Sequence, residues 1–366
     1  MTLVFGLAQR GYNISLACSS LSKEQEAHLR EVGVDVILID LRRLLNPFAD
    51  VNAAIQLYRL LRAGKFSILH THMSKAALLG GIVGRLARVP VVVNTAHNLG
   101  FVALPHRALR ILFWFYDKIL FGLTMDCVVT VSENLRKAVV NAKLVAVRKV
   151  VAITNGIDPT RFNNANGATV RRELGLSDDQ CVIGCIARLV WFKGLDTLIE
   201  AARTVSERFP HARIVIVGDG PLGDALRHQA ASLGLSDYIL FLGERTDIPN
   251  LFAAFDLFVL PSVSEGMPIT ILEAMAARCA VVATAVGGVA EVVSDNDTGI
   301  LTPARDSRRL AEAIISLLDD PERRTRMAVA GRARFEREFH AQAMIDATDT
   351  LYRTLIASQR LGEDAA

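Results

Sequence analysis

Short apolar runs, separated by longer stretches with helical periodicity, constrain the fold more than any other feature of this chain. The runs show no polar alternation, which is typical of parallel strands buried on both faces of a sheet. They form two series: 14–18, 34–39, 68–72, 89–95, 127–131 and 150–154, then 182–187, 213–217, 239–242, 257–260 and 281–283. Helical stretches between successive runs predict βαβ units, and therefore an α/β fold with doubly wound parallel sheets.

The two series predict two Rossmann-like domains. A chain of 366 residues is long for a single domain. Residues 155–159 and 163–167 are rich in turn-forming residues and separate the two series. We expect a first domain over residues 1–158, a second over residues 159–340, and a C-terminal helical segment over residues 341–366.

The start of the first domain departs from the usual pattern. Residues 2–10 are typical of the end of a helix, Gly11 ends it, and a strand opens at Ile14. A doubly wound domain ordinarily begins with a strand and a glycine-rich turn before such a helix. We therefore expect the first domain to lack its first strand and its glycine turn.

Charge and cysteine content restrict the class of protein. A net charge of +3 is too small to indicate nucleic acid as the main partner. Five cysteines without a C-x-x-C pair are typical of buried free thiols in a reducing compartment. The most apolar stretch, residues 101–123, is interrupted by Arg107, Arg110, Asp117 and Lys118, so it is not expected to span a bilayer. We expect a cytoplasmic protein.

Residues 265–276 (EGMPITILEAMA) join a glycine turn to the start of a helix. Pro268 favours the first helical position. The backbone N–H groups from Gly266 to Ile269 would then point at a ligand, and such a helix end suits a phosphate or sugar oxygen. Glu265 lies in the turn and Glu273 one turn inside the helix, so the two carboxylates could reach opposite ends of one ligand. The alternative is a core helix with incidental acids.

This segment resembles the E-x7-E signature of family 4 glycosyltransferases, which are retaining enzymes of the GT-B fold with two Rossmann-like domains facing a cleft. The resemblance implies that Glu265 lies near the donor sugar and that Glu273 binds the nucleotide ribose. It also implies that the C-terminal helix crosses back to the first domain. Further donor contacts are implied for the turn itself: Gly266, Met267, Pro268 and Ile269.

Two cations precede a predicted helix of the second domain. Arg188 ends a strand, and Lys193 lies just before a helix that starts near Leu195. A cation at a helix N-terminus opposes the macrodipole by about 0.3–1 kcal/mol, and an anion bound between the two cations would remove this conflict. The pair resembles the R-x4-K motif of the same family, whose cations hold the donor diphosphate and stabilise it as leaving group. Solvated surface charges are the alternative.

Further candidate residues lie where predicted strands end. His97 matches a family histidine that contacts the donor sugar near the reacting carbon; the alternative is a histidine hydrogen-bonded within its loop. The resemblance also makes Lys75 a candidate for binding an anionic acceptor group, and Ser132, after a predicted strand, is expected to face the same cleft. It implies that Arg245 lies near the base pocket, with pairing to Asp247 as the alternative.

Two other motifs suggest different chemistry. Residues 218–223 (GDGPLG) follow a strand and fit G-x-G-x-x-G, which would indicate an NAD-linked sugar-modifying enzyme. However, this turn follows the second strand of its domain, and the resembled family carries a similar G-D-G-P turn there. Residues 295–297 (DND) imitate a metal-binding D-x-D motif, but a surface turn fits them better. We expect no metal and no other cofactor.

Basic and aromatic residues interleave between residues 101 and 118, which suits a helix lying on an anionic bilayer surface. The alternative is a helix packed on its own sheet with exposed basic residues. We expect a retaining glycosyltransferase that moves a hexose-type sugar from a UDP- or GDP-sugar to a cell-envelope polysaccharide or lipid-linked saccharide. A nucleotide-sugar-binding protein, impaired by the absent glycine turn, is the second hypothesis.

Overall fold

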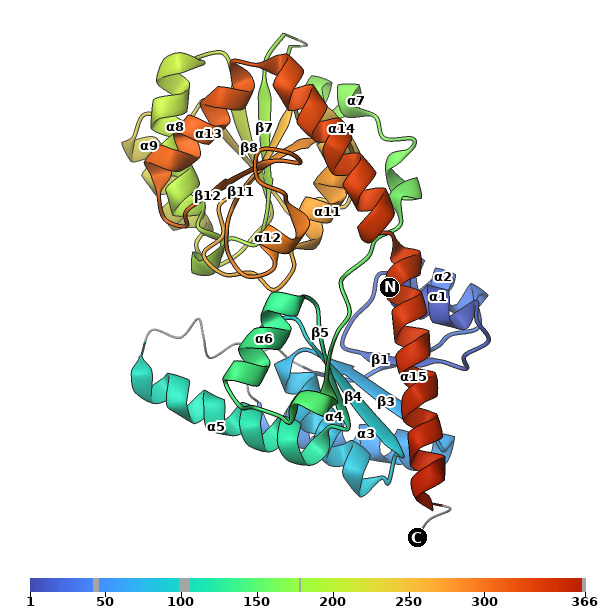
Figure 1. Cartoon of the computed structure of the whole chain (residues 1–366). Helices are drawn as coiled ribbons and strands as arrows, with labels where there is room; N and C mark the ends of the chain where they lie inside the picture. Colours follow the sequence, from blue (N-terminus) through green and yellow to red (C-terminus); the bar gives the residue numbers. More distant parts are fainter. Residues whose placement is uncertain (42–45, 99–105, 178, 364–366) are drawn as a thin grey trace. The chain divides into compact units, whose positions relative to one another are not determined.

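Parallel sheets form the centre of both units in the computed structural model, which describes residues 1–41, 46–98, 106–177 and 179–363 (Figure 1). One unit comprises Met1–Asn155 together with Ala341–Ala366, and the other comprises Gly156–His340. Every run predicted as a strand overlaps a strand of the structure, with ends that agree to within two residues. The prediction of an α/β fold with parallel sheets is therefore confirmed.

The strands of the first unit form two separate parallel sheets. In one, β1 (Ser15–Cys18) pairs with β2 (Asp35–Leu38). The other has the order β3 (Ile68–His72), β4 (Val91–Ala96), β5 (Cys127–Thr130) and β6 (Val150–Ala152). No strand of the described residues is hydrogen-bonded between β1 and β3. Both are largely half-buried, whereas β4 and β5 are buried throughout.

Helices cover both faces of the four-stranded sheet. Alternate side chains of β4 point to opposite faces. Val91 and Val93 pack with Met344 and other apolar residues of the C-terminal helix α15 (Ala341–Glu363). On the other face α4 (Ser74–Leu86) comes so close that a Cβ at Gly84 would lie 3.2 Å from Val92. The remaining helices of this unit are α1 (Thr2–Ala8), α2 (Lys23–Glu31), α3 (Pro47–Gly64), α5 (Arg107–Thr124) and α6 (Glu133–Asn141).

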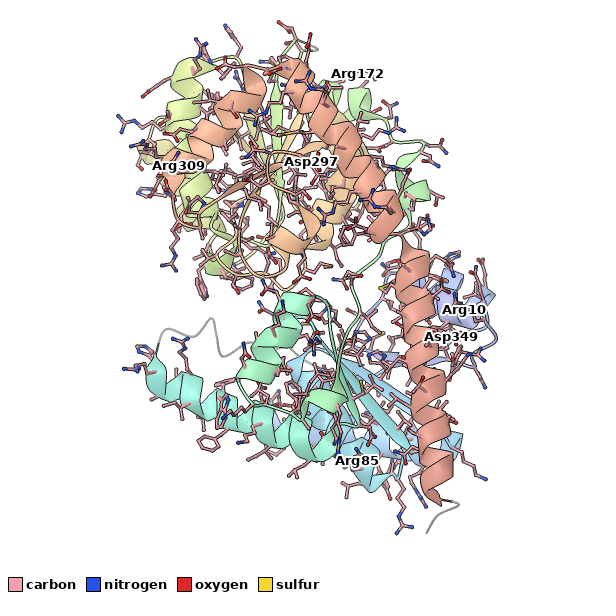
Figure 2. The ribbon with its side chains drawn as sticks, viewed as in Figure 1. Arg10, Arg85, Arg172, Asp297, Arg309 and Asp349 are labelled. Carbon is pink, nitrogen blue, oxygen red and sulfur yellow. The ribbon has the colours of Figure 1, made fainter. Side chains whose placement is uncertain are left out.

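Ion pairs attach α15 to the start of the chain. Arg10, just after α1, pairs with Asp346 and with Asp349 of α15, the latter at 3.5 Å between Nη1 and Oδ2. Figure 2 shows Arg10 and Asp349 beside one another along this helix. The hydroxyl of Tyr12 donates to Asp349 at 2.5 Å. These contacts join the two ends of the chain within the first unit.

The second unit contains one continuous six-stranded sheet. Its order is β12 (Ile300–Thr302), β11 (Ala280–Thr284), β10 (Leu257–Leu260), β7 (Val182–Ile186), β8 (Arg213–Val217) and β9 (Ile239–Gly243). No apolar run of the sequence predicted β12, which has only three residues. Residues 295–297 form a turn before it, in which the Asp295 carboxylate accepts the N–H of Leu301 at 2.8 Å. This agrees with the surface turn that we expected there.

The strand order of this sheet reverses between β7 and β10. The chain proceeds from β7 to β8 and β9 on one side, and then returns to β10 on the other side of β7. Helices connect the strands: α8 (Leu195–Arg208), α9 (Gly223–Ser232), α10 (Ile248–Ala254), α11 (Ile269–Ala276), α12 (Val289–Val292) and α13 (Ser307–Leu318), with α7 (Gly167–Glu173) before the sheet and α14 (Pro321–Glu338) after it. In the described part of the chain, no helix combines the length and apolarity that crossing a bilayer requires.

Candidate functional site

The predicted cationic motif and the predicted glutamate turn meet at the reversal of the second sheet. Ligands of open parallel sheets bind outside the carboxyl ends of the strands at such a switch point. Arg188 and Lys193 follow β7, and the turn containing Glu265 follows β10, which is the neighbour of β7. Lys193 and Glu265 are 72 residues apart in the sequence, and the strand order brings them to one edge of the sheet.

Lys193 and Glu265 form an ion pair at this edge. The Lys193 Nζ lies 2.6 Å from Oε1 of Glu265, and the side chains are 17% and 9% exposed. The hydroxyl of Ser262 donates to the same oxygen at 2.6 Å. Charge-assisted hydrogen bonds of this length hold a carboxylate in one orientation. Both bonds engage Oε1, so the second carboxylate oxygen of Glu265 keeps its acceptor capacity for a ligand.

Arg188 provides the second cation of the site. Its side chain is exposed at the end of β7. Among the residues that the structure describes, no carboxylate is paired with it. Lys193 is therefore already neutralised by a protein carboxylate, whereas the charge of Arg188 is available to an anionic ligand.

A glycine on the next strand connection allows the glutamate turn to pack closely. Gly287, after β11, has a φ of 54°, and a Cβ at this position would lie 1.7 Å from the carbonyl oxygen of Glu265. Only glycine tolerates both this backbone conformation and this approach. The N–H of Gly288 also donates to the carbonyl oxygen of Gly266 at 2.9 Å. The turn that carries Glu265 is thus fixed by backbone contacts on a neighbouring connection.

The turn at residues 218–223 has a similar packing role. A Cβ at Gly218 would lie 2.1 Å from the carbonyl oxygen of Ala187, on the connection that leads to Arg188 and Lys193. The N–H of Leu189 donates to the carbonyl oxygen of Asp219 at 2.9 Å. Close packing of two connections therefore accounts for this glycine without a bound dinucleotide.

The helix after the glutamate turn begins one residue later than predicted. Pro268 is the N-cap residue, in an extended conformation with φ −75° and ψ 117°, and α11 begins at Ile269. The prediction that Pro268 is the first helical residue is wrong by one position. Proline's fixed φ suits the N-cap as well as the first helical position, so the residue type alone does not distinguish them. No side chain caps the first turn of α11. The side chain of Met267 is buried in the core, whereas that of Ile269 is half exposed.

Glu273 is the second acid of the predicted pair and lies on α11. Burial raises its pKa to about 7, and the positive charge of Arg161 partly offsets this effect. Arg161 belongs to a short 3-10 helix, Pro159–Phe162, at the start of the second unit. Sequence reasoning missed Arg161, since nothing in its local sequence indicates a neighbour more than a hundred residues away. It also missed Ser262, whose position just after a strand was an available signal.

Arg245 has protein partners in the structure. Its guanidinium donates to both oxygens of Asp247 at 2.8 Å. It also donates to Glu173 of α7, at 2.5 and 2.9 Å. The hydrogen bonds that Arg245 donates to Asp247 and Glu173 raise the pKa of Arg245 above its usual value. The pairing alternative is thus observed, and a donor contact by Arg245 stays a prediction.

The predicted histidine of the first unit belongs to a cluster. Nε2 of His97 lies 3.2 Å from Nδ1 of His72. The ring of His72 stacks on that of His70 at 4.5 Å between centroids. Burial lowers the pKa of His97, which favours a neutral imidazole. This partner lies at the end of β3 and not within the loop of His97, so the hydrogen bond differs from the alternative that we expected. A contact between His97 and the donor sugar stays a prediction.

The two predicted acceptor residues are engaged with protein groups. The Lys75 Nζ lies 2.5 Å from Oδ1 of Asp50 on α3. Ser132 is fully buried, and its hydroxyl accepts the N–H of Leu135 at 3.2 Å as the N-cap of α6. This cap accounts for the serine at the end of β5 by helix capping. An acceptor contact by either residue stays a prediction.

Comparison with known proteins places the chain in a family. Residues 168–334 match the model "Glycosyl transferases group 1", and residues 1–161 match the model "Glycosyltransferase Family 4". The UDP-Gal:alpha-D-GlcNAc-diphosphoundecaprenol alpha-1,3-galactosyltransferase of Escherichia coli is 32% identical over 283 residues, which cover 76% of this chain and 73% of the relative. The N-acetyl-alpha-D-glucosaminyl L-malate synthase of Bacillus anthracis is 26% identical over 98% of this chain and 93% of its own length.

Solved structures show the same architecture. Anabaena Alr3699/HepE in complex with UDP-glucose has a TM-score of 0.82 at 22% identity, covering 96% of this chain and 94% of that chain. The sucrose-phosphate synthase of Thermosynechococcus elongatus has a TM-score of 0.80 at 23% identity, covering 97% and 92%. The chain belongs to glycosyltransferase family 4. It is a glycosyltransferase with the GT-B fold.

Proposed function

We propose that this enzyme moves a hexose-type sugar from a UDP- or GDP-sugar to a cell-envelope polysaccharide or lipid-linked saccharide, with retention of the anomeric configuration. The observation that carries the proposal is the placement of Arg188, Lys193 and Glu265 at one switch point of the second sheet. The name of the Escherichia coli relative supports a nucleotide-sugar donor and a diphosphoundecaprenol-linked acceptor. The UDP-glucose complex of HepE supports the donor class.

Leaving-group stabilisation is the main catalytic task of such a site. When the bond between the sugar and the diphosphate breaks, negative charge develops on the distal phosphate. We assign its stabilisation to Arg188, to the remaining N–H groups of Lys193, and to the uncapped first turn of α11. Fixed cations and amides perform this role without reorganisation, so we propose that transfer needs neither a metal ion nor another cofactor.

The two glutamates have different roles in this proposal. Lys193 and Ser262 hold Glu265 through Oε1. The second carboxylate oxygen of Glu265 accepts a hydrogen bond from a hydroxyl of the donor sugar. Glu273 accepts the ribose hydroxyls, and a pKa of about 7 leaves it partly ionised at neutral pH. Retaining glycosidases use one of two carboxylates as a nucleophile. Because Glu265 is already bound by two donors, we propose instead that the acceptor attacks directly, on the face from which the diphosphate departs, with a phosphate oxygen as base.

The acceptor side is proposed for the first unit. From the same unit, His97, which burial keeps neutral, can donate a hydrogen bond to the donor sugar near the reacting carbon or accept one from it. A lipid-linked acceptor would be met at the inner face of the membrane, so we propose a cytoplasmic enzyme that associates peripherally with that surface. Nucleic acid is not an expected partner.

Calorimetry with UDP-, GDP- and ADP-sugars tests the donor assignment. We expect selective binding of one nucleotide class, lost in Lys193→Ala and Glu273→Ala. Arg308→Ala, which changes an exposed cation on α13, is the matched control and should bind normally. Binding of NAD without binding of any nucleotide sugar would reject the proposal. Donor binding without product from any saccharide or lipid-linked acceptor would favour the impaired donor-binding protein.

A further inference from the structure

Three neighbouring helices of the first unit expose an unusual number of large apolar side chains. α3 packs against α4, and α4 packs against α5 (Figure 1). We call their exposed apolar side chains the apolar face. Its members are Phe48, Val51, Ile55 and Tyr58 on α3, Ile82 and Leu86 on α4, and Leu109, Ile111, Leu112, Phe113, Phe115, Ile119 and Leu123 on α5. So many exposed large apolar side chains on neighbouring helices indicate an interaction surface rather than scattered surface residues.

α5 contributes most of the apolar face. Of its 18 residues only Asp117, Leu120 and Phe121 are buried. The indole N–H of Trp114 donates to the carbonyl oxygen of Ala142 at 2.6 Å, which attaches the helix to the segment after α6. Leu123, in contrast, is 74% exposed. The helix is therefore held along one side, and its remaining apolar surface has no covering element among the described residues.

The segment from the start of α3 to the end of α5 carries a strong positive charge. Residues 46–125 contain nine lysines and arginines and two aspartates, a formal net charge of +7. The whole chain has a net charge of only +3, so all other residues together carry −4. Of the two aspartates, Asp50 is paired with Lys75, and Asp117 is buried. Neither acid is available to neutralise the face.

Exposed cations lie on, or just after, the helices that carry the apolar face. They are Arg59 and Arg62 on α3, Arg88 after α4, and Arg107, Arg110 and Lys118 on α5. Arg85, at the end of α4, instead pairs with Asp126 at 2.7 Å and is labelled in Figure 2. Helices with exposed apolar side chains beside lysines and arginines are typical of segments that lie at the interface of an anionic bilayer.

We propose that the apolar face docks this enzyme on the surface of an anionic lipid bilayer. Apolar side chains of α5 would enter the boundary between head groups and acyl chains, and the cations would contact the lipid phosphates. A second copy of the chain is a less suitable occupant, because two faces of the same strong positive charge would repel each other. The inference rests on the proposed function in one respect: docking would give the enzyme access to a lipid-linked acceptor.

Vesicle flotation of the full chain tests the proposal. One set of vesicles contains phosphatidylglycerol with phosphatidylcholine, and the other contains phosphatidylcholine alone. We expect flotation with the first set and little with the second, and weaker flotation as salt is added. Arg107→Ala with Arg110→Ala should reduce the partition coefficient on anionic vesicles about 25-fold, since each basic residue near the surface contributes about fivefold.

A second variant removes apolar side chains from α5. Ile111→Ser, Leu112→Ser and Ile119→Ser together should abolish flotation. The matched controls lie in the second unit. Val329→Ser changes a similarly exposed apolar residue on α14 and is the control for the apolar variant. Arg203→Ala with Arg308→Ala is the control for the variant that removes Arg107 and Arg110. Both controls should float like the unmodified chain.

The outcomes separate docking from the proposed function. Absence of flotation with phosphatidylglycerol, or equal flotation with both vesicle sets, would overturn the docking proposal. A dimer in solution that the apolar variant dissociates would also overturn it, in favour of a second copy as the occupant. Calorimetric donor binding by the same variants should remain unchanged, because the changes lie in the first unit. Failure of donor binding in the unmodified chain would instead count against the proposed function alone.

Discussion

The two units are built from the same βαβ repeat but differ in the continuity of their sheets. The second unit has a single six-stranded sheet, in which β7, β10 and β11 are buried throughout. The first unit divides its strands between a pair and a set of four. Among the residues that the structure describes, β1 and β3 are each hydrogen-bonded to one strand only, and both are largely half-buried.

The two units also differ in how the polar side chains at their strand ends are bonded. In the second sheet, the strand order juxtaposes the connections after β7 and β10, and Lys193, Ser262 and Glu265 are already hydrogen-bonded together. In the first unit, the polar side chains at β3 bond to other elements. His70, on β3, contacts the hydroxyls of Thr95 and of Tyr352 on α15. The proposed donor contacts can therefore be tested on residues of the second unit alone.

The largest expected effect is on catalysis in the second unit. Arg188→Ala should lower the turnover of sugar transfer about 100- to 1000-fold, because a fixed charge on the leaving group is lost. Its side chain is exposed, so the thermal unfolding midpoint should not change. Arg308→Ala serves as the matched exposed cation. Normal turnover in Arg188→Ala would show that this cation does not act on the leaving group.

The close packing of the glutamate turn should be sensitive to a single methyl group. Gly287→Ala combines a positive φ with a Cβ 1.7 Å from a backbone oxygen, and should lower the free energy of unfolding by about 3 kcal/mol or more. Gly175→Ala is the matched control, since Gly175 has a φ of 66° and open space around its Cβ position. It should cost about 1 kcal/mol. Urea unfolding measures both, and equal costs would contradict the packing argument.

A pH-dependent stability is expected from Glu273. Its pKa in the folded state, about 7, lies above the usual glutamate value, so the fold favours the protonated form. Stability should fall as pH rises from about 5 to 7.5, by about 2 kcal/mol for this group. Glu273→Gln should remove that part of the dependence. Urea titrations of the two proteins across this pH range provide the measurement; parallel curves would refute the assignment.

The smallest expected change is in the free energy of unfolding when one buried tyrosine of each unit loses its hydroxyl. Tyr352→Phe leaves a nitrogen of the buried His70 without its partner and should cost about 1–2 kcal/mol. Tyr238→Phe removes a 3.1 Å hydrogen bond to the carbonyl oxygen of Phe209, a half-buried residue that water can reach. It should cost about 1 kcal/mol or less. A larger loss for Tyr238→Phe in thermal unfolding would contradict this order.

Sequence reasoning was most successful for the buried strands and least successful for side-chain partners. Continuous apolar runs identified the positions of eleven strands, because buried parallel strands admit few polar residues. The three-residue β12 lacked such a run. Pairing of Arg245 with Asp247, two residues away, could be proposed, but its second partner Glu173 could not. Local spacing carries no information about a partner that lies 72 residues earlier.

The sequence by itself determined the α/β class, the strand positions and the resemblance to family 4 glycosyltransferases, since these depend on local periodicity and contiguous motifs. Only the tertiary structure decided that Lys193 meets Glu265 and Ser262, that Arg161 lies near Glu273, and that the helices α3 to α5 leave an apolar face uncovered. The physical reason is that these features depend on the order of strands within a sheet and on what packs over each helix, neither of which a short stretch of sequence specifies.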